Sequence, residues 1–149
     1  MDNKVVIVGS VGTICTKLEN DILVFDHPKS LMGEYFEKAK IKINAEYKFM
    51  FAKHSSEVTK EDRQKLIEYL VRYQYNYSKA MVLYGTNPDS TNETIACLKE
   101  VPEIKDKTII IVGSEYPFGF YNSDAPFQIG KALGILAIAN PGIYSVFNF

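Results

Sequence analysis

The feature that most constrains this chain is a short run of β-branched residues that ends in a cluster of glycines and hydroxyl side chains. The run is Val5–Val8, and the cluster that follows it contains Ser10, Gly12, Thr13 and Thr16. A short apolar run bounded by glycine is typical of a strand buried in a parallel sheet. Open α/β sheets bind ligands at the carboxyl ends of such strands, so the cluster is a candidate site. The alternative is a structural turn in which the threonines bond their own backbone.

The rest of the chain alternates between strand-like and helix-like segments. Further apolar runs predict strands at residues 47–51, 80–84, 108–112 and 143–147. Apolar residues at helical spacing predict helices at residues 30–39, 59–77, 91–101 and 125–139. Such alternation is typical of a parallel sheet covered by helices on both faces. The sequence therefore predicts a three-layer α/β fold with a five-stranded parallel sheet, and with Val5–Val8 and Ile109–Ile111 in its core.

Composition narrows the class of protein. The chain has 149 residues, 46% of them hydrophobic, which is enough to bury the core of one domain. Its net charge of −1 gives no field that would hold nucleic acid or an anionic membrane, and neither is expected as a partner. No signal peptide precedes the first strand, and the isolated Cys15 and Cys97 are expected as reduced thiols rather than a disulfide or a zinc site. We expect a cytoplasmic protein with no metal and no cofactor.

Polar residues follow four of the predicted strands. Because the carboxyl ends of parallel strands meet at one edge of a sheet, these residues are expected to converge on a single pocket. A purely structural loop needs turn residues but no such convergence. The candidate ligand-binding residues are Ser10, Gly12, Thr13, Lys53, His54, Ser55, Ser56, Gly85, Thr86, Asn87, Ser114 and Glu115.

Three segments of the chain resemble motifs of the asparaginases of the bacterial type. The segment Val8-Gly9-Ser10-Val11-Gly12-Thr13-Ile14 is similar to their T-G-G-T-I motif, with Ser10 and Val11 in place of the first Thr and Gly. The segment Tyr84-Gly85-Thr86-Asn87, followed by Asn92-Glu93-Thr94, is similar to H-G-T-D-T-x-E-E-T with a short insertion. Lys107–Leu133 resembles their segment after the fourth strand. The resemblance covers essentially the whole chain but only the amino-terminal domain of those enzymes, and it is closest to short, stand-alone members of the family.

The resemblance implies a fold and roles for individual residues. Together with the alternation of strands and helices, it predicts the flavodoxin-like strand order 2-1-3-4-5 and a single asparaginase amino-terminal-like domain over residues 1–149. Thr13 matches the nucleophilic threonine, Ser55 matches the serine that holds the substrate carboxylate, and Thr86 matches the second catalytic threonine. The family's aspartate position holds Asn87, unless the insertion brings Asp89 there, and the family's lysine lies beyond the fifth strand.

These departures decide the predicted function. Asparagine cannot accept a proton at neutral pH, and a threonine hydroxyl is a poor nucleophile without a base. We therefore predict a protein that binds a small amino-acid or nucleotide-type metabolite in an asparaginase-like pocket, with weak or no amidohydrolase activity. The alternative is an asparaginase or glutaminase with Thr13 as nucleophile and Thr86 as its catalytic partner. An interaction module without a ligand is the third interpretation.

Several other side chains have a functional and a structural interpretation. His54 could replace the missing base or lie at the surface, Lys53 could face an anionic ligand or water, and Cys15 is expected as a small buried thiol. Tyrosines at spacing four, Tyr69, Tyr73 and Tyr77, are expected to pack one helix face.

A homodimer or a dimer of dimers is expected because the pocket of one small domain would otherwise stay open. Phe118, Phe120 and Tyr121 are candidates for a ring-stacking wall or for the subunit contact, and Phe147 and Phe149 are further candidates for that contact.

Overall fold

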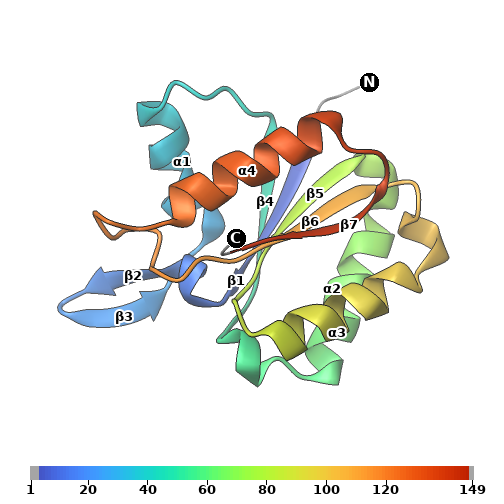
Figure 1. Cartoon of the computed structure of the whole chain (residues 1–149), viewed down its shortest axis with the longest axis horizontal. Coiled ribbons are helices and arrows are strands. Elements are labelled where there is room, and N and C mark those ends of the chain that lie inside the picture. Colours follow the sequence, from blue (N-terminus) through green and yellow to red (C-terminus); the bar gives the residue numbers. More distant parts are fainter. Residues whose placement is uncertain (1–3, 148–149) are drawn as a thin grey trace.

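The computed structural model describes residues 4–147, apart from the side chain of Ser10, and contains a five-stranded sheet (Figure 1). All neighbouring strands of this sheet are parallel, in the order β4-β1-β5-β6-β7. Their bounds are β1 (Val5–Val11), β4 (Ala45–Lys53), β5 (Lys79–Leu83), β6 (Thr108–Val112) and β7 (Gly142–Val146). The predicted fold class is confirmed.

Two further strands, which the sequence analysis did not predict, form a separate antiparallel hairpin between β1 and the first helix. They are β2 (Thr16–Glu19) and β3 (Ile22–Phe25). Between them, Asn20 and Asp21 have φ values of 50° and 61°, the left-handed conformation that a two-residue hairpin turn requires and that Asn and Asp tolerate. The observed sheet order is 4-1-5-6-7, whereas the predicted order was 2-1-3-4-5. The numbers differ because the observed labels include the two hairpin strands, and the prediction counted only the five strands of the parallel sheet.

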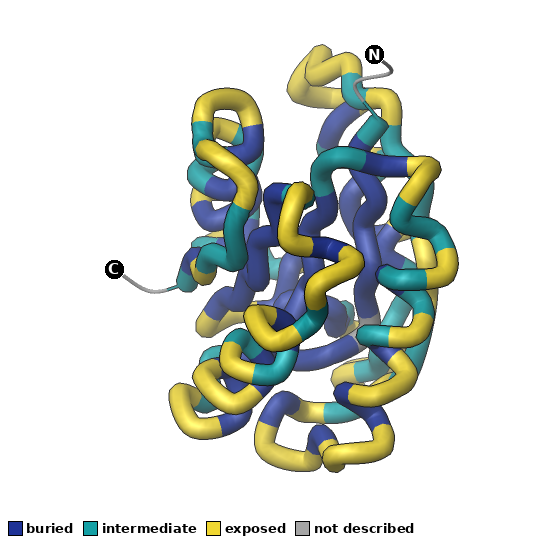
Figure 2. The backbone as a smooth tube through the Cα atoms, turned by 90° about the vertical axis from the view of Figure 1, so that its right-hand side faces the viewer, coloured by how far each residue is buried: buried dark blue, intermediate teal, exposed yellow. Residues whose placement is uncertain are grey.

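Helices cover both faces of the sheet, which gives three layers (Figure 1). Buried residues of α1 (Pro28–Lys38) and α4 (Ala125–Ile138) share one core cluster with alternate residues of the strands. Buried residues of α2 (Lys60–Arg72) and α3 (Pro88–Lys99) share the other. Figure 2 shows the strands as a mostly buried layer inside an exposed outer surface. Short 3₁₀ turns complete the structure: η1 (Thr13–Cys15), η2 (Ser55–Glu57), η3 (Gln74–Asn76) and η4 (Pro102–Ile104).

The central strands form the predicted core. Ile109, Ile110 and Ile111 are fully buried, and Val5–Val8 are also buried. Because side chains alternate across a strand, Ile110 packs with α1 and α4 while Ile109 and Ile111 pack with α2 and α3. Cys15 is buried and Cys97 is half-buried, and no disulfide joins cysteines in the described part of the chain. Within residues 4–147, no helix combines the length and the apolar character needed to cross a membrane.

The second helix ends earlier than its sequence pattern predicts. It begins with a capping box, in which Thr59 and Asp62 exchange side-chain to backbone hydrogen bonds of 3.2 and 2.9 Å. It ends at Arg72, and the chain turns through η3 to reach β5. Tyr77 is therefore not on the helix, and its hydroxyl donates to the carbonyl of Leu70 at 2.9 Å. The prediction that Tyr77 shares a helix face with the other two tyrosines is wrong.

The aromatic loop between β6 and α4 contributes to the core as well as to the surface. Phe118 is buried and packs edge-on against the ring of Tyr35 in α1, with ring centroids 5.6 Å apart. We expected Phe118 to be an exposed contact residue, and this is wrong because the loop folds back onto α1. Phe120 and Phe147 are half-buried and Tyr121 is fully exposed, whereas Phe149 lies outside the described residues.

Candidate ligand-binding site

A cavity of about 320 Å³ lies at the carboxyl ends of three neighbouring strands, β4, β1 and β5. The chain passes from β1 to β4 on one side of it and continues later with β5 on the other side. The cavity therefore lies where the strand order reverses, which is where open α/β sheets place ligand sites. Its lining residues are Gly12, Thr13, His54, Ser55, Ser56, Gly85, Thr86 and Asn87.

Two glycines let the three loops of the cavity touch through their backbones. Gly12 has a φ of 80°, and a Cβ atom there would lie 2.5 Å from the Cα of Gly85. A Cβ atom on Gly85 would in turn lie 2.0 Å from Oγ of Ser55. The amide of Gly12 also donates to the carbonyl of Lys53 at 2.8 Å. These positions need glycine because any side chain would separate the loops.

Ser55 and Asn87 are fixed by hydrogen bonds that define what they can offer a ligand. Asn87 is the N-cap of α3, and its Oδ1 accepts from the amide of Ser90 at 2.9 Å. The backbone amide of Asn87 donates to Oγ of buried Ser55 at 3.3 Å. The amide NH₂ of Asn87 and the hydroxyl proton of Ser55 are not used in these bonds, and they can donate to a ligand.

Thr13 and His54 lie at the hairpin side of the cavity. Thr13 begins η1, and its carbonyl accepts from the hydroxyl of Thr16 at 2.7 Å. His54 directly follows β4, and its amide donates to Oε2 of Glu57 at 2.9 Å. The imidazole of His54 packs edge-on against Phe25 of β3, with ring centroids 5.3 Å apart. The unpredicted hairpin is thus in contact with a residue that lines the cavity.

Four of the predicted ligand-binding residues are not among the lining residues. The ammonium of Lys53 pairs with Oδ2 of Asp62 at 2.7 Å, and its contact with a ligand stays a prediction. The hydroxyl of buried Ser114 donates to the carbonyl of Tyr116 at 2.7 Å. Glu115 is exposed and its backbone amide donates to Asp124 at 3.1 Å. The fourth is Ser10, whose side chain lies outside the described structure.

The Lys53–Asp62 pair fixes the loop that supplies His54 and Ser55. Asp62 is buried, which raises the pKa of its carboxyl, but hydrogen bonds from Lys53 and Thr59 outweigh burial and hold the pKa below its ordinary value. The carboxylate joins the end of β4 to the start of α2. Lys53 therefore has a structural role at this edge of the sheet.

A buried polar network behind the cavity was not predicted. The guanidinium of Arg63 in α2 donates to Oγ1 of Thr94 at 3.1 Å and to Oγ of Ser90 at 3.3 Å, and it pairs with Oε2 of Glu93 at 3.2 Å. The hydroxyl of Tyr84 lies 2.7 Å from Ser90 Oγ and 3.0 Å from Thr94 Oγ1. Tyr84 directly precedes Gly85, so the network supports the segment Gly85–Asn87 from behind. The sequence signal was a tyrosine placed immediately before the glycine.

Comparison with protein families identifies the chain. The family model described as asparaginase, N-terminal, matches residues 4–148. The chain belongs to the asparaginase N-terminal family. The resemblance seen in its motifs is confirmed. A comparison with curated proteins found no match.

Solved asparaginases share the fold of this asparaginase-family chain. The thermostable L-asparaginase from Thermococcus kodakarensis is 23% identical, with a TM-score of 0.81 over 97% of this chain and 44% of its own. A probable cytoplasmic L-asparaginase from Campylobacter jejuni is 19% identical, with a TM-score of 0.78 over 99% and 45%. L-asparaginase I from Vibrio cholerae is 21% identical, with a TM-score of 0.69 over 90% and 40%. The chain thus spans less than half the length of each.

Proposed function

We propose that this asparaginase-family chain binds a small amino-acid or nucleotide-type metabolite in the cavity and hydrolyses amides weakly or not at all. One observation carries the proposal. The described residues that line the cavity offer hydroxyl, amide and imidazole groups, and none of them is an aspartate, a glutamate or a lysine. Its volume suits a small ligand.

The hydrogen-bonding groups of the cavity suit a ligand with carboxylate and amide groups. The hydroxyl of Ser55 and the NH₂ of Asn87 are donors, because their oxygens already accept backbone amides. Thr13 and Thr86 add hydroxyls that both donate and accept. Gly12 and Gly85 leave the backbone open to close approach by a ligand.

The described residues that line the cavity include no carboxylate and no lysine to carry the proton of a threonine nucleophile. The carbonyl oxygen of Asn87 caps a helix and has no basicity at neutral pH. The ammonium of Lys53 is paired with Asp62, and Lys53 is not among the residues that line the cavity. Without a base beside it, the hydroxyl of Thr13 attacks an amide carbonyl slowly.

A second candidate function is an asparaginase-type or glutaminase-type amidohydrolase with Thr13 as nucleophile. Family membership favours it, and so does the position of His54 on the wall of the same cavity. A neutral imidazole can take the proton of Thr13 as its oxygen attacks the amide carbon. The imidazolium would return that proton to the amide nitrogen, which leaves as ammonia, and water would then hydrolyse the acyl-threonine.

Thermal-shift measurements and ammonia release separate the two functions. A ligand bound at a hundred times its Kd stabilises the fold by about 2.7 kcal/mol, so amino acids and nucleotides can be screened by the rise in Tm. We expect a ligand whose shift is lost in Ser55→Ala and retained in the surface variant Ser145→Ala. Ammonia release from L-asparagine at about 10 per second, abolished by Thr13→Ala, would instead establish the amidohydrolase.

We also propose a homodimer or a dimer of dimers with the cavity near the contact. The exposed apolar residues Leu18, Ile22 and Tyr121 supply surface that association would bury. Light scattering that gives a monomer mass at micromolar concentration would reject this assembly. The cytoplasmic location stays a prediction.

A further inference from the structure

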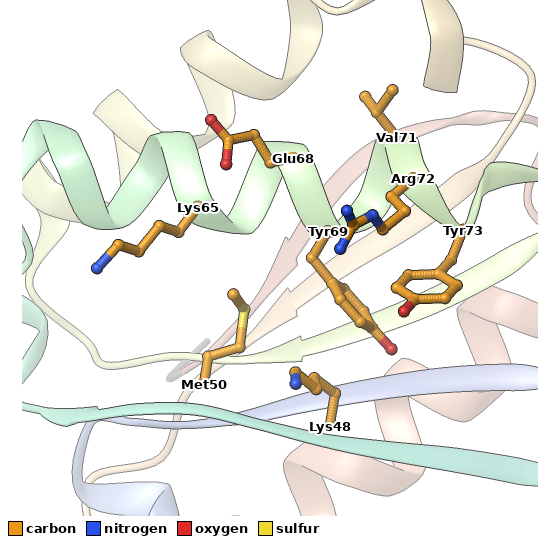
Figure 3. A pocket seen from close by; sticks show the side chains of 8 residues that line it. All are labelled: Lys48, Met50, Lys65, Glu68, Tyr69, Val71, Arg72 and Tyr73. Atoms are coloured by element: carbon orange, nitrogen blue, oxygen red, sulfur yellow. The ribbon is translucent and has the colours of Figure 1, made fainter.

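A second hollow, which shares none of its described lining residues with the cavity, lies between the edge strand β4 and helix α2. We call it the β4–α2 groove; its volume is about 580 Å³. Figure 3 shows that Tyr69 of α2 and Tyr73, directly after the helix, extend towards β4, with Lys48 and Met50 on the strand below them. The lining residues are Lys48, Met50, Lys65, Glu68, Tyr69, Val71, Arg72 and Tyr73.

The groove carries an excess of positive charge. Three of its residues are cations, and within residues 4–147 none of Lys48, Lys65 and Arg72 has an acidic partner at ion-pair distance. Its one acid, Glu68, accepts from Gln64 at 3.4 Å, and its carboxylate points away from β4 in Figure 3. Three cations against the one carboxylate of Glu68 leave an excess of positive charge in the groove, which suits an anion with two charges.

The groove also offers aromatic faces. The rings of Tyr69 and Tyr73 lie 4.9 Å apart at an angle of 48°. The ammonium of Lys48 lies 5.6 Å from the centre of the Tyr69 ring, a distance at which a cation is attracted to the electron-rich face of an aromatic ring. Burial raises the pKa of Tyr69, which keeps its hydroxyl a donor. Both tyrosines are half-buried, so part of each ring is exposed to solvent and could contact a planar ligand.

We propose that the β4–α2 groove binds a planar aromatic ligand that carries a phosphate monoester, a purine nucleoside monophosphate in chemical class. The base would stack on the tyrosines while the phosphate pairs with Lys65 and Arg72, since guanidinium and ammonium groups bind phosphate oxygens strongly. A single nucleotide fits the net charge of −1 better than a polynucleotide, which needs an extended basic surface. The proposal does not depend on the function proposed for the cavity.

NMR titration with adenosine 5′-monophosphate tests the proposal and locates the ligand. We expect saturable shifts of backbone amides in residues 48–50 of β4 and 65–73 of α2. Adenosine lacks the phosphate and inorganic phosphate lacks the ring, so each should bind at least about tenfold more weakly. A match in strength between inorganic phosphate and the nucleotide would overturn the aromatic part of the proposal.

Variants assign the contacts. The double variant Lys65→Gln, Arg72→Gln should raise the Kd about tenfold or more, and Tyr73→Leu should raise it while keeping an apolar side chain against the strand. Lys60→Gln, on the same helix but outside the groove, is the matched control and should leave the Kd unchanged. Three results would overturn the proposal: no saturable shift up to about 10 mM nucleotide, shifts confined to residues 12–13, 54–56 and 85–87, or an unchanged Kd in the double variant.

Discussion

The cavity at the carboxyl end of the sheet and the β4–α2 groove are built in opposite ways. The cavity is held by main-chain contacts: Gly12 against Gly85, and Ser55 beneath the amide of Asn87. The groove is formed by long side chains that project from a helix and an edge strand, such as Lys48 and Tyr69. A single added carbon atom should therefore break the cavity, whereas the groove should accept substitution without loss of the fold.

The largest expected effect is that of Gly85→Ala. The new Cβ atom would lie 2.0 Å from Oγ and 2.4 Å from Cβ of Ser55, so the loops after β4 and β5 must separate. We expect a loss of stability at the upper end of the 1–3 kcal/mol typical of overpacking, about 3 kcal/mol, and loss of ligand binding in the cavity. Urea denaturation measures the first effect and the thermal-shift screen measures the second.

Gly130→Ala is the matched control for this variant. Gly130 lies in α4, and a Cβ atom there meets nothing within 4 Å. Alanine in an exposed helix is about 0.5–1 kcal/mol more favourable than glycine, so this variant should be more stable than the parent. Equal stability of the two alanine variants would contradict the claim that backbone contact builds the cavity.

The next effect concerns the network behind the cavity. Tyr84→Phe keeps the buried ring but removes the hydroxyl that bonds Ser90 and Thr94. We expect a loss of about 1–2 kcal/mol, because the hydroxyls of Ser90 and Thr94, which also accept from Arg63, lose a shared partner. Ligand binding in the cavity should weaken as well, while nucleotide binding in the groove should not change. Tyr121→Phe, at a fully exposed tyrosine, is the control in the same denaturation experiment.

The contrast between the two regions also explains which features could be predicted from the sequence. All eight residues that line the cavity were predicted, because each follows a strand directly and the strands are marked by short apolar runs. Their role as ligand contacts stays a prediction. The hairpin was missed although Asn20-Asp21, a pair that tolerates left-handed backbone, stood between two short apolar segments.

The features that the sequence did not reveal depend on partners in other elements. Lys53 was predicted to face either a ligand or water, but its ammonium pairs with Asp62 in the first turn of the next helix, and its contact with a ligand stays a prediction. Phe118 was assigned to the surface, but Tyr35 of α1 covers it. Arg63 bonds residues 27 and 31 positions away, in α3, and no local pattern indicates such a contact. No sequence motif marks the groove, because it is formed where side chains of an amphipathic helix extend over an edge strand.

The third expected effect is a pH dependence at the junction of the two regions. The pKa of Asp62 is held below its ordinary value, so the ionised carboxylate stabilises the fold above the unfolded pKa, about 3.9. That contribution is lost as the pH falls through the lower pKa of the folded state. Asp62→Asn should cost about 1 kcal/mol at pH 7 and make stability less steep below about pH 4. Urea denaturation of both proteins at pH 7 and pH 3 measures this; an equal gap at both values would contradict the assignment.

The smallest expected effect is on the stability of groove variants, and it completes the comparison. The ammonium of Lys48 and the guanidinium of Arg72 have no acidic partner within residues 4–147, so their removal breaks no ion pair. Lys48→Gln and Arg72→Gln should each change the free energy of unfolding by less than about 0.5 kcal/mol, as is usual for surface positions. Urea denaturation without ligand gives this value, and repetition with saturating adenosine 5′-monophosphate should raise the stability of the parent more than that of either variant. A large loss of stability without ligand would mean that these cations support the fold, and the groove would then be built like the cavity rather than in contrast to it.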